Sequence, residues 1–273
     1  MLKRIGLLGC GSIGTGIALA IDSGRIPARL TQVYDISKAR AEALTSRLKN
    51  RPQLVANPHL LSSRDVDIVV EAASQDAVRD NALSILQNRR DLMVMSTGAL
   101  LDESVYTVLE DACREFKKMI YVPSGAIAGL DGLRAVRDEL EDVTLTTTKH
   151  PDALRGAKFF ESADISVDDI AEKTAIFSGT AAEAVSLFPS NINVAALLSL
   201  AGLGSARTHV MIVADPATTR NSHRIEARGA FGKMTILAEN VPDITNTKTS
   251  RLAVLSAIET LRQICVSDIR VGT

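Results

Sequence analysis

The chain has 273 residues, a formal net charge of −1 at pH 7 and three scattered cysteines. Its 31 basic and 32 acidic residues nearly balance, which gives no indication of a nucleic-acid or membrane partner, and 3% aromatic content disfavours a base-stacking platform. No apolar run in the sequence approaches the ~20 residues that cross a bilayer, and no cleavage site follows the glycine-broken start, so we expect a cytosolic protein. The cysteine spacing predicts neither a disulfide framework nor a metal site.

Strand and helix signals alternate through the first part of the chain. Strands are predicted at 4–9, 30–35, 66–73, 91–97 and 118–125, and helices at 12–24, 37–50, 76–88 and 102–116. This rhythm, with apolar strands buried on both faces, is typical of a parallel sheet between helices. We therefore predict an α/β fold whose residues 1–123 form a doubly wound, Rossmann-type domain.

The pattern changes after about residue 140. Segments 142–151, 206–216, 222–229 and 233–242 alternate apolar and polar residues, which favours a mixed sheet with one exposed face. Helices are predicted at 179–189 and 191–204, and a strongly amphipathic one at 248–265. We predict a second α/β domain over 124–243, and a segment 244–273 whose helix packs back on the first domain.

Residues 9–14 read GCGSIG and fit the G-x-G-x-x-G pattern between a predicted strand and a predicted helix, the context of a dinucleotide site. Gly9 allows a tight turn, Gly11 lets the backbone approach a pyrophosphate, and Gly14 allows close packing of helix on sheet. The helix start, with Ser12 and Ile13, would offer free N–H groups to the phosphates. A glycine-rich turn without a ligand is the alternative.

Asp35 ends the second predicted strand, where an acidic residue binds the ribose hydroxyls and disfavours a 2′-phosphate. NAD is therefore the expected cofactor. Ser37, a plausible N-cap, is followed by Lys38 and Arg40, and these residues could accommodate the 2′-phosphate of NADP if the ribose shifts. NADP is therefore the alternative cofactor.

Residues 72–75 and 96–99 follow two later strands, at the edge where doubly wound sheets bind ligands. Ala73 and Ser74 are further cofactor candidates there, and ordinary βα turns are the alternative.

Two segments of the second half are hard to explain by packing alone. Residues 123–132 read PSGAIAGLDG, and their backbone N–H groups could face a nicotinamide amide or a carboxylate. Residues 188–202 read FPSNINVAALLSLAG, in which Asn191 is a reasonable helix cap while Asn193 could face a ligand; capping by both is the alternative. His223 lies in TRNSHRIEAR, and periodicity alone does not decide whether it is catalytic.

Together these segments resemble the L-aspartate dehydrogenase family. The resemblance covers nearly the whole chain, through GLLGCGSIG, VVEAASQ, PSGAIAGLDG, FPSNINVAA, RNSHRIEARG and TKTSRLAVLSAIETLR in that order. It implies a second domain of the dihydrodipicolinate-reductase type, a homodimer, and oxidation of L-aspartate by NAD or NADP to iminoaspartate, which hydrolyses to oxaloacetate and ammonia or feeds NAD biosynthesis. It also implies cofactor contacts at Ala126 and at Asn191 or Asn193, and a catalytic role for His223.

This chemistry moves a hydride from Cα to nicotinamide C4 and needs a neutral amine, so a base must take a proton from the ammonium. Histidine suits this role as general acid/base because its ordinary pKa is near neutral. The two substrate carboxylates need cationic or N–H donors. Candidates are Ser124 and Gly125 in the loop and the cations Lys149, Arg207 and Arg220, and for each cation a solvated surface side chain is the alternative. Arg224 would point away from the strand face that carries His223 and is a weaker candidate.

Two other functions are consistent with this architecture. The first is a dehydrogenase or reductase that acts on another small amino or dicarboxylic acid. A dihydrodipicolinate reductase would be expected to carry paired histidines, which the sequence lacks, and a homoserine dehydrogenase would bring a larger substrate domain. The second is a non-catalytic NAD-sensing protein, which would not need the ordered asparagine and histidine segments.

Overall fold

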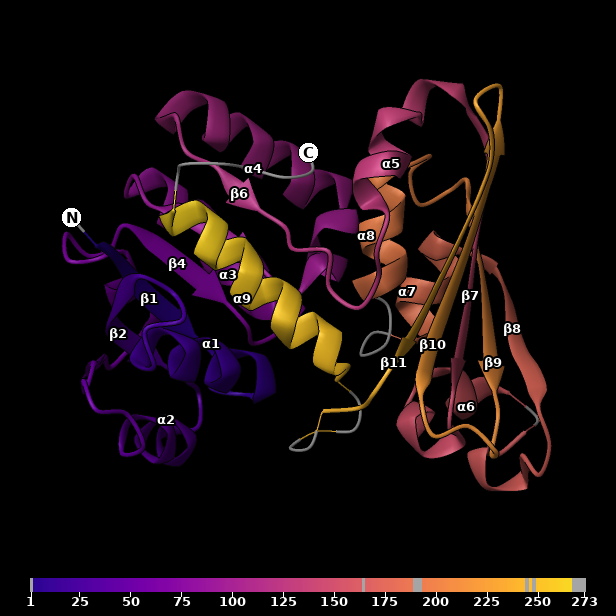
Figure 1. Cartoon of the computed structure of the whole chain (residues 1–273), viewed down its shortest axis with the longest axis horizontal. Coiled ribbons are helices and arrows are strands. Elements are labelled where there is room, and N and C mark those ends of the chain that lie inside the picture. Colours follow the sequence, from indigo (N-terminus) through magenta and orange to yellow (C-terminus); the bar gives the residue numbers. More distant parts are fainter. Residues whose placement is uncertain (1, 164, 189–192, 244–245, 247–248, 267–273) are drawn as a thin grey trace. The chain divides into compact units, whose positions relative to one another are not determined.

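The computed structural model describes residues 2–163, 165–188, 193–243, 246 and 249–266 (Figure 1). The chain divides into two compact units, Met1–Pro123 with Val254–Thr273, and Ser124–Ala253. Among the described residues, no helix has the length and apolar character needed to cross a membrane.

The first unit is built on a parallel sheet with the strand order β3-β2-β1-β4-β5-β6. This is the order of a doubly wound Rossmann sheet, and it reverses direction between β1 and β4, where such folds bind their ligands. The fold class predicted from the sequence is confirmed. The strands are β1 (Lys3–Leu8), β2 (Ala28–Tyr34), β3 (Gln53–Leu54), β4 (Ile68–Glu71), β5 (Asp91–Val94) and β6 (Ile120–Tyr121).

Helices pack against this sheet through apolar stripes. The main core cluster joins alternate strand residues such as Ile5 and Val70 to helix residues such as Ile17 and Leu261. A Cβ on Gly16 of α1 would collide with Val254 of α9, so these two helices are in close contact (Figure 1). The helices are α1 (Ser12–Asp22), α2 (Lys38–Thr45), α3 (Gln75–Gln87), α4 (Glu103–Phe116) and α9 (Arg251–Cys265), with 3₁₀ turns η1 (Pro58–Ser62) and η2 (Thr97–Leu101).

The second unit is built on a mixed sheet with the order β11-β10-β7-β9-β8, in which β7 and β9 are parallel and the other pairs antiparallel. Alternation along β10 buries one face, whereas Arg224 on the other face is exposed. The strands are β7 (Leu140–Lys149), β8 (Thr174–Thr180), β9 (Thr208–Ala214), β10 (Asn221–Gly229) and β11 (Gly232–Asn240).

Short helices complete the second unit, and Figure 1 shows α5, α7 and α8 on one side of its sheet. A capping box, which was not predicted from the sequence, forms the start of α7: the Thr180 side chain accepts from the Glu183 amide, and the Glu183 carboxylate accepts from the Thr180 amide. The helices are α5 (Leu130–Ala135), α6 (Phe159–Ser162), α7 (Ala181–Leu187) and α8 (Asn193–Ala201), with 3₁₀ turns η3 (Arg137–Glu139), η4 (Pro151–Leu154) and η5 (Val167–Asp169).

The structure differs from the sequence prediction at a few elements. Strand β8 was not predicted, because this edge strand lacks a clean alternation and carries Gly179 near its end. The helix predicted over 37–50 ends at Thr45, and its apolar period continues to buried Leu48 through tighter turns with i→i+3 hydrogen bonds.

Candidate functional site

The glycine turn after β1 has the shape expected of a dinucleotide site. Gly9 has φ of +102°, and a Cβ there would lie 2.5 Å from the Ala72 carbonyl oxygen. A Cβ on Gly14 would collide with the carbonyl oxygen of Gly9, whereas one on Gly11 would meet open space. The turn is therefore closed on the protein side and open at Gly11, where α1 begins with Ser12, so the residues present fit a bound pyrophosphate.

Asp35 follows β2 and is bonded to the glycine turn itself. Its carboxylate accepts hydrogen bonds from the Cys10 amide at 2.7 Å and from the Ser37 amide at 2.8 Å, and the residue is 8% exposed. The Arg40 guanidinium lies 3.8 Å away. Asp35 thus fixes the end of β2 to the turn, a structural role that was not predicted from the sequence.

The neighbours of Asp35 have different surroundings. Burial, and secondarily the Asp35 charge, raises the pKa of the Cys10 thiol to about 12, so the thiol stays protonated. Ser37 caps α2 by accepting from the Arg40 amide, as the sequence predicted. Lys38 instead pairs with Glu42 on the surface, at 3.6 Å.

Glu71 joins the turns that follow β4 and β5. Its carboxylate accepts hydrogen bonds from the amides of Ala73 (2.8 Å), Met95 (3.1 Å) and Ser96 (3.0 Å), and from the Ser96 hydroxyl at 2.8 Å. Burial raises the pKa of Glu71, and the four donors act in the opposite direction. Glu71 was not among the residues predicted for the site, although one acidic side chain at the end of an otherwise apolar strand is a signal of such a role. Ser74 caps α3 by accepting from the Ala77 amide.

The buried face of the second sheet carries a histidine and a lysine. His223 on β10 is 2% exposed, and its Nδ1 lies 3.0 Å from the hydroxyl of Thr147, its register partner on β7. Lys149 lies two residues after Thr147 on β7, on the same buried face, and is 5% exposed. Burial, and then the charge of Lys149, lowers the pKa of His223 to about 3, so the imidazole is neutral.

The loop between β6 and α5 is anchored to this sheet. The Asn240 side-chain amide on β11 donates to the Ala126 carbonyl at 2.9 Å, with both residues buried. Gly125 has φ of +62°, and the Ile127 amide donates to the Ser124 carbonyl at 3.3 Å. Ser124, Gly125 and Ala126 are therefore held in one compact turn next to β11.

The remaining sequence candidates are more scattered. Asn193 is the first residue of α8 and is exposed, and Asn191 lies outside the described residues. Arg207 is exposed and donates to the Glu141 carbonyl. It precedes the residue of β9 that pairs with Val143, four residues along β7 from the partner of His223, so the structure does not bring Arg207 and His223 together.

The two remaining arginine candidates are exposed. Arg220 is exposed just before β10. Arg224 pairs with Glu226, its Nε 3.3 Å from the carboxylate, on the face opposite to His223, as the alternation predicted. Two histidines that the sequence does not mark as candidates have local partners: His150 caps the turn η4, and a ring nitrogen of His209 lies 3.1 Å from the Ser178 hydroxyl.

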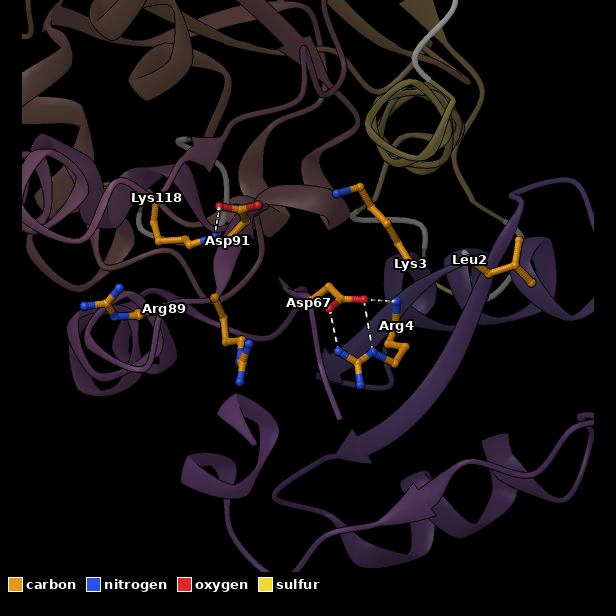
Figure 2. Close-up of a pocket in the computed structure, with 8 residues that line it drawn as sticks. Leu2, Lys3, Arg4, Asp67, Arg89, Asp91 and Lys118 are labelled. Atoms are coloured by element: carbon orange, nitrogen blue, oxygen red, sulfur yellow. Dashed lines mark hydrogen bonds and ion pairs between the residues drawn. The ribbon is translucent and has the colours of Figure 1, made fainter. Parts of the chain in front are cut away.

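A hollow of about 470 Å³ lies at the opposite, amino-terminal edge of the first sheet (Figure 2). Arg4 binds Asp67 there at 2.7 Å, and Lys118 lies 3.6 Å from Asp91. Arg89 and Arg90 follow the C-terminus of α3 and Lys118 follows that of α4, where positive charge offsets the helix dipole, so the placement of these three cations needs no ligand. Lys3 is the first residue of β1. The lining residues are Leu2, Lys3, Arg4, Asp67, Arg89, Arg90, Asp91 and Lys118.

Two family profiles match the chain. One, described as the NAD-binding domain of homoserine dehydrogenase, matches residues 9–123, and the other, described as the C-terminal domain of aspartate dehydrogenase, matches residues 131–264. Together with the strand order and the glycine turn, these matches define the class of the protein. It is an oxidoreductase with a Rossmann-type domain for a nicotinamide cofactor and a second unit on a mixed sheet.

Individual relatives narrow the class to one family. The chain is 65% identical over 272 residues to an L-aspartate dehydrogenase of Nitrosopumilus maritimus, with 100% of both chains covered. It is 46% identical to one of Methanocella arvoryzae, with 99% of both covered. The crystal structure of an aspartate dehydrogenase from Thermotoga maritima matches with a TM-score of 0.75 and 29% identity, over 99% of this chain and 100% of that one. The chain belongs to the L-aspartate dehydrogenase family.

Proposed function

We propose that the protein oxidises L-aspartate to iminoaspartate with NAD or NADP, with His223 as the general acid/base. The product would hydrolyse to oxaloacetate and ammonia or feed NAD biosynthesis. The observation that carries this proposal is the buried pair of His223 and Lys149 on one sheet face, in a chain of this family. It unites a neutral proton acceptor with a cation suited to an anionic substrate.

The glycine turn would hold the pyrophosphate through backbone N–H groups at the start of α1. When bound, the oxidised nicotinamide supplies the acceptor for the hydride that leaves Cα. Asp35 would accept a ribose hydroxyl, which favours NAD, while Arg40 beside it is the cation that could meet a 2′-phosphate. Further proposed cofactor contacts are Ser12, Ile13, Ala73, Ser74, Ala126 and one of Asn191 and Asn193.

His223 would remove a proton from the substrate ammonium, because the nitrogen needs a free lone pair before the imine can form. The same imidazole could activate water for hydrolysis of the imine. Thr147 at Nδ1 would hold the ring so that Nε2 serves as the proton acceptor. Burial favours the uncharged imidazole, which is the form that accepts a proton.

Lys149 would bind one carboxylate of the substrate, and backbone donors of Ser124 and Gly125 the other. Binding of a substrate carboxylate by Lys149 would also change the pKa of His223. The Lys149 charge lowers the pKa of His223, so a carboxylate that neutralises this charge would raise the pKa again and make the imidazole a stronger base. Substrate binding would thus activate His223. The homodimer and the cytosolic location stay predictions from the sequence and the family resemblance.

The direct test is an assay of purified protein with L-aspartate and either NAD or NADP, followed by the absorbance of the reduced cofactor. We expect turnover with aspartate, and we expect His223→Ala to lower kcat by roughly 10²–10⁴-fold. Lys149→Met should raise KM for aspartate by about 10–100-fold, the cost of a lost charge-assisted hydrogen bond. Arg224→Gln, on the opposite face next to His223, is the matched control and should leave both constants unchanged.

Other results would redirect the assignment. Good turnover of another amino or hydroxy acid without turnover of aspartate would identify a different dehydrogenase. Cofactor binding without turnover of any small acid would favour an NAD-sensing protein. A modest change in KM alone for His223→Ala would contradict the role of His223 as the base.

A further inference from the structure

The inner face of β11 lies along the loop that precedes α5. Residues of β11 alternate between an exposed face and a face that is half-buried or buried, and the latter carries Met234, Ile236 and Asn240. A Cβ on Gly129 would collide with Ile236, and one on Gly132 would lie 3.1 Å from the Met234 side chain. The strand therefore contacts the segment 126–132 at several points along its length.

Asn240 makes the polar contact in this series. Its Nδ2 donates to the Ala126 carbonyl at 2.9 Å, across a sequence separation of 114 residues. Asn240 is 5% exposed and Ala126 6%, so little water is available to replace either partner. A buried carbonyl that loses its donor is costly, which makes this bond a strong local constraint on the loop.

The same strand sets the position of His223. In the β10–β11 register, Asn240 pairs with Asn221 and Ala238 pairs with His223. The two pairs are two residues apart along each strand, and side chains two residues apart point to the same face of a sheet. Asn240 and His223 therefore lie on one face, in neighbouring pairs of that face. Asn221 is also tied down, with its Nδ2 3.5 Å from the Ser250 hydroxyl.

The loop needs such a constraint because its backbone turns at two glycines. Gly125 has φ of +62° and Gly129 has φ of +74°, conformations that glycine adopts without steric cost. Between them, Ala126 and Ile127 are buried. A segment bounded by two flexible residues would not by itself hold a backbone group to the sub-ångström tolerance of a reaction site.

We propose that Asn240 is a positioning residue that, by donating to the Ala126 carbonyl, holds the loop 124–129 in a fixed place relative to His223. It would not touch the substrate. Its effect would pass through the loop, which the proposed function assigns to the cofactor and to a substrate carboxylate, so the catalytic part of this inference rests on that function. The structural part, the restraint of the loop, is independent of it.

The test compares Asn240→Ala and Asn240→Asp with Glu239→Gln, an exposed neighbour on the same strand. Aspartate keeps the shape of asparagine but presents an oxygen to the carbonyl in place of a donor. Hydrogen–deuterium exchange of the free protein, resolved by peptide, measures the loop directly. We expect exchange in 124–129 to rise by about ten-fold or more in both Asn240 variants, with β7 and β10 unchanged and Glu239→Gln like the wild type.

Steady-state kinetics with L-aspartate and NAD then separate positioning from simple binding. We expect kcat to fall about ten-fold or more with a smaller change in KM for aspartate, because misplaced groups slow the reaction more than they weaken substrate capture. Unchanged exchange in the loop would overturn the restraint. A loosened loop with unchanged kcat, or loosening throughout β7 and β10, would overturn the positioning role. An inactive wild type would instead contradict the proposed function and leave the exchange result valid.

Discussion

Glu71→Ala is expected to destabilise the first unit strongly, since the carboxylate serves four donors in a buried place. The Met95 amide also bonds the Glu71 backbone carbonyl and keeps that partner, and the Ser96 hydroxyl can rotate. The Ala73 and Ser96 amides then lose their acceptor, at about 1–3 kcal/mol each. Two effects offset part of this cost: water can enter the vacated volume, and the variant no longer buries an ionisable group. The expected loss is therefore about 2–4 kcal/mol in the free energy of unfolding.

Urea denaturation of Glu71→Ala beside Glu115→Ala measures this loss. Glu115 is exposed on α4, and its removal should change the free energy of unfolding by no more than about 0.5 kcal/mol. Cofactor affinity, followed by fluorescence titration with the reduced dinucleotide, should fall in Glu71→Ala because the turns at 72–74 and 95–97 are no longer held together. A loss below about 1 kcal/mol with unchanged affinity would refute the reasoning that this carboxylate organises the carboxyl edge of the sheet.

Two further predictions concern the glycine turn and the histidine. Gly11→Ala should keep the melting temperature of the protein but weaken cofactor binding, because the new Cβ would occupy the open space proposed for the pyrophosphate. Gly14→Ala should lower both the melting temperature and the cofactor affinity, because its Cβ would collide with the Gly9 carbonyl. Equal melting temperatures of the two variants would contradict this geometry. His223 titrates at about 3 in the folded protein and near 6.5 when unfolded. The unfolded chain therefore binds the extra proton between these values, and stability falls as pH drops from 6.5 toward 3, by about 5 kcal/mol at most. His223→Gln should lose less stability than the wild type between pH 7 and pH 4.5 in urea denaturation, and equal losses would mean that the imidazole titrates near its ordinary value.

Local sequence patterns were enough to predict the architecture. Continuous apolar runs indicate a parallel sheet, because its strands are buried on both faces. The GCGSIG segment indicates a dinucleotide turn, because a positive φ at Gly9 and the close packing at Gly14 both require glycine. The same holds for Ser37, whose capping bond is made within four residues. Strand β8 was missed because its pattern is weak and its pairing with β9 forms across intervening helices.

The sequence by itself determined the fold class, the glycine turn and the alternation that places His223 and Arg224 on opposite faces, since each follows from periods of two to four residues. Only the tertiary structure decided what these groups contact. Cys10 meets Asp35, Ala73 and Ser96 meet Glu71, Thr147 meets His223, and Asn240 meets Ala126. These partners are brought together by strand pairing and chain reversal, and the burial that lowers the pKa of His223 exists only once the sheet has formed.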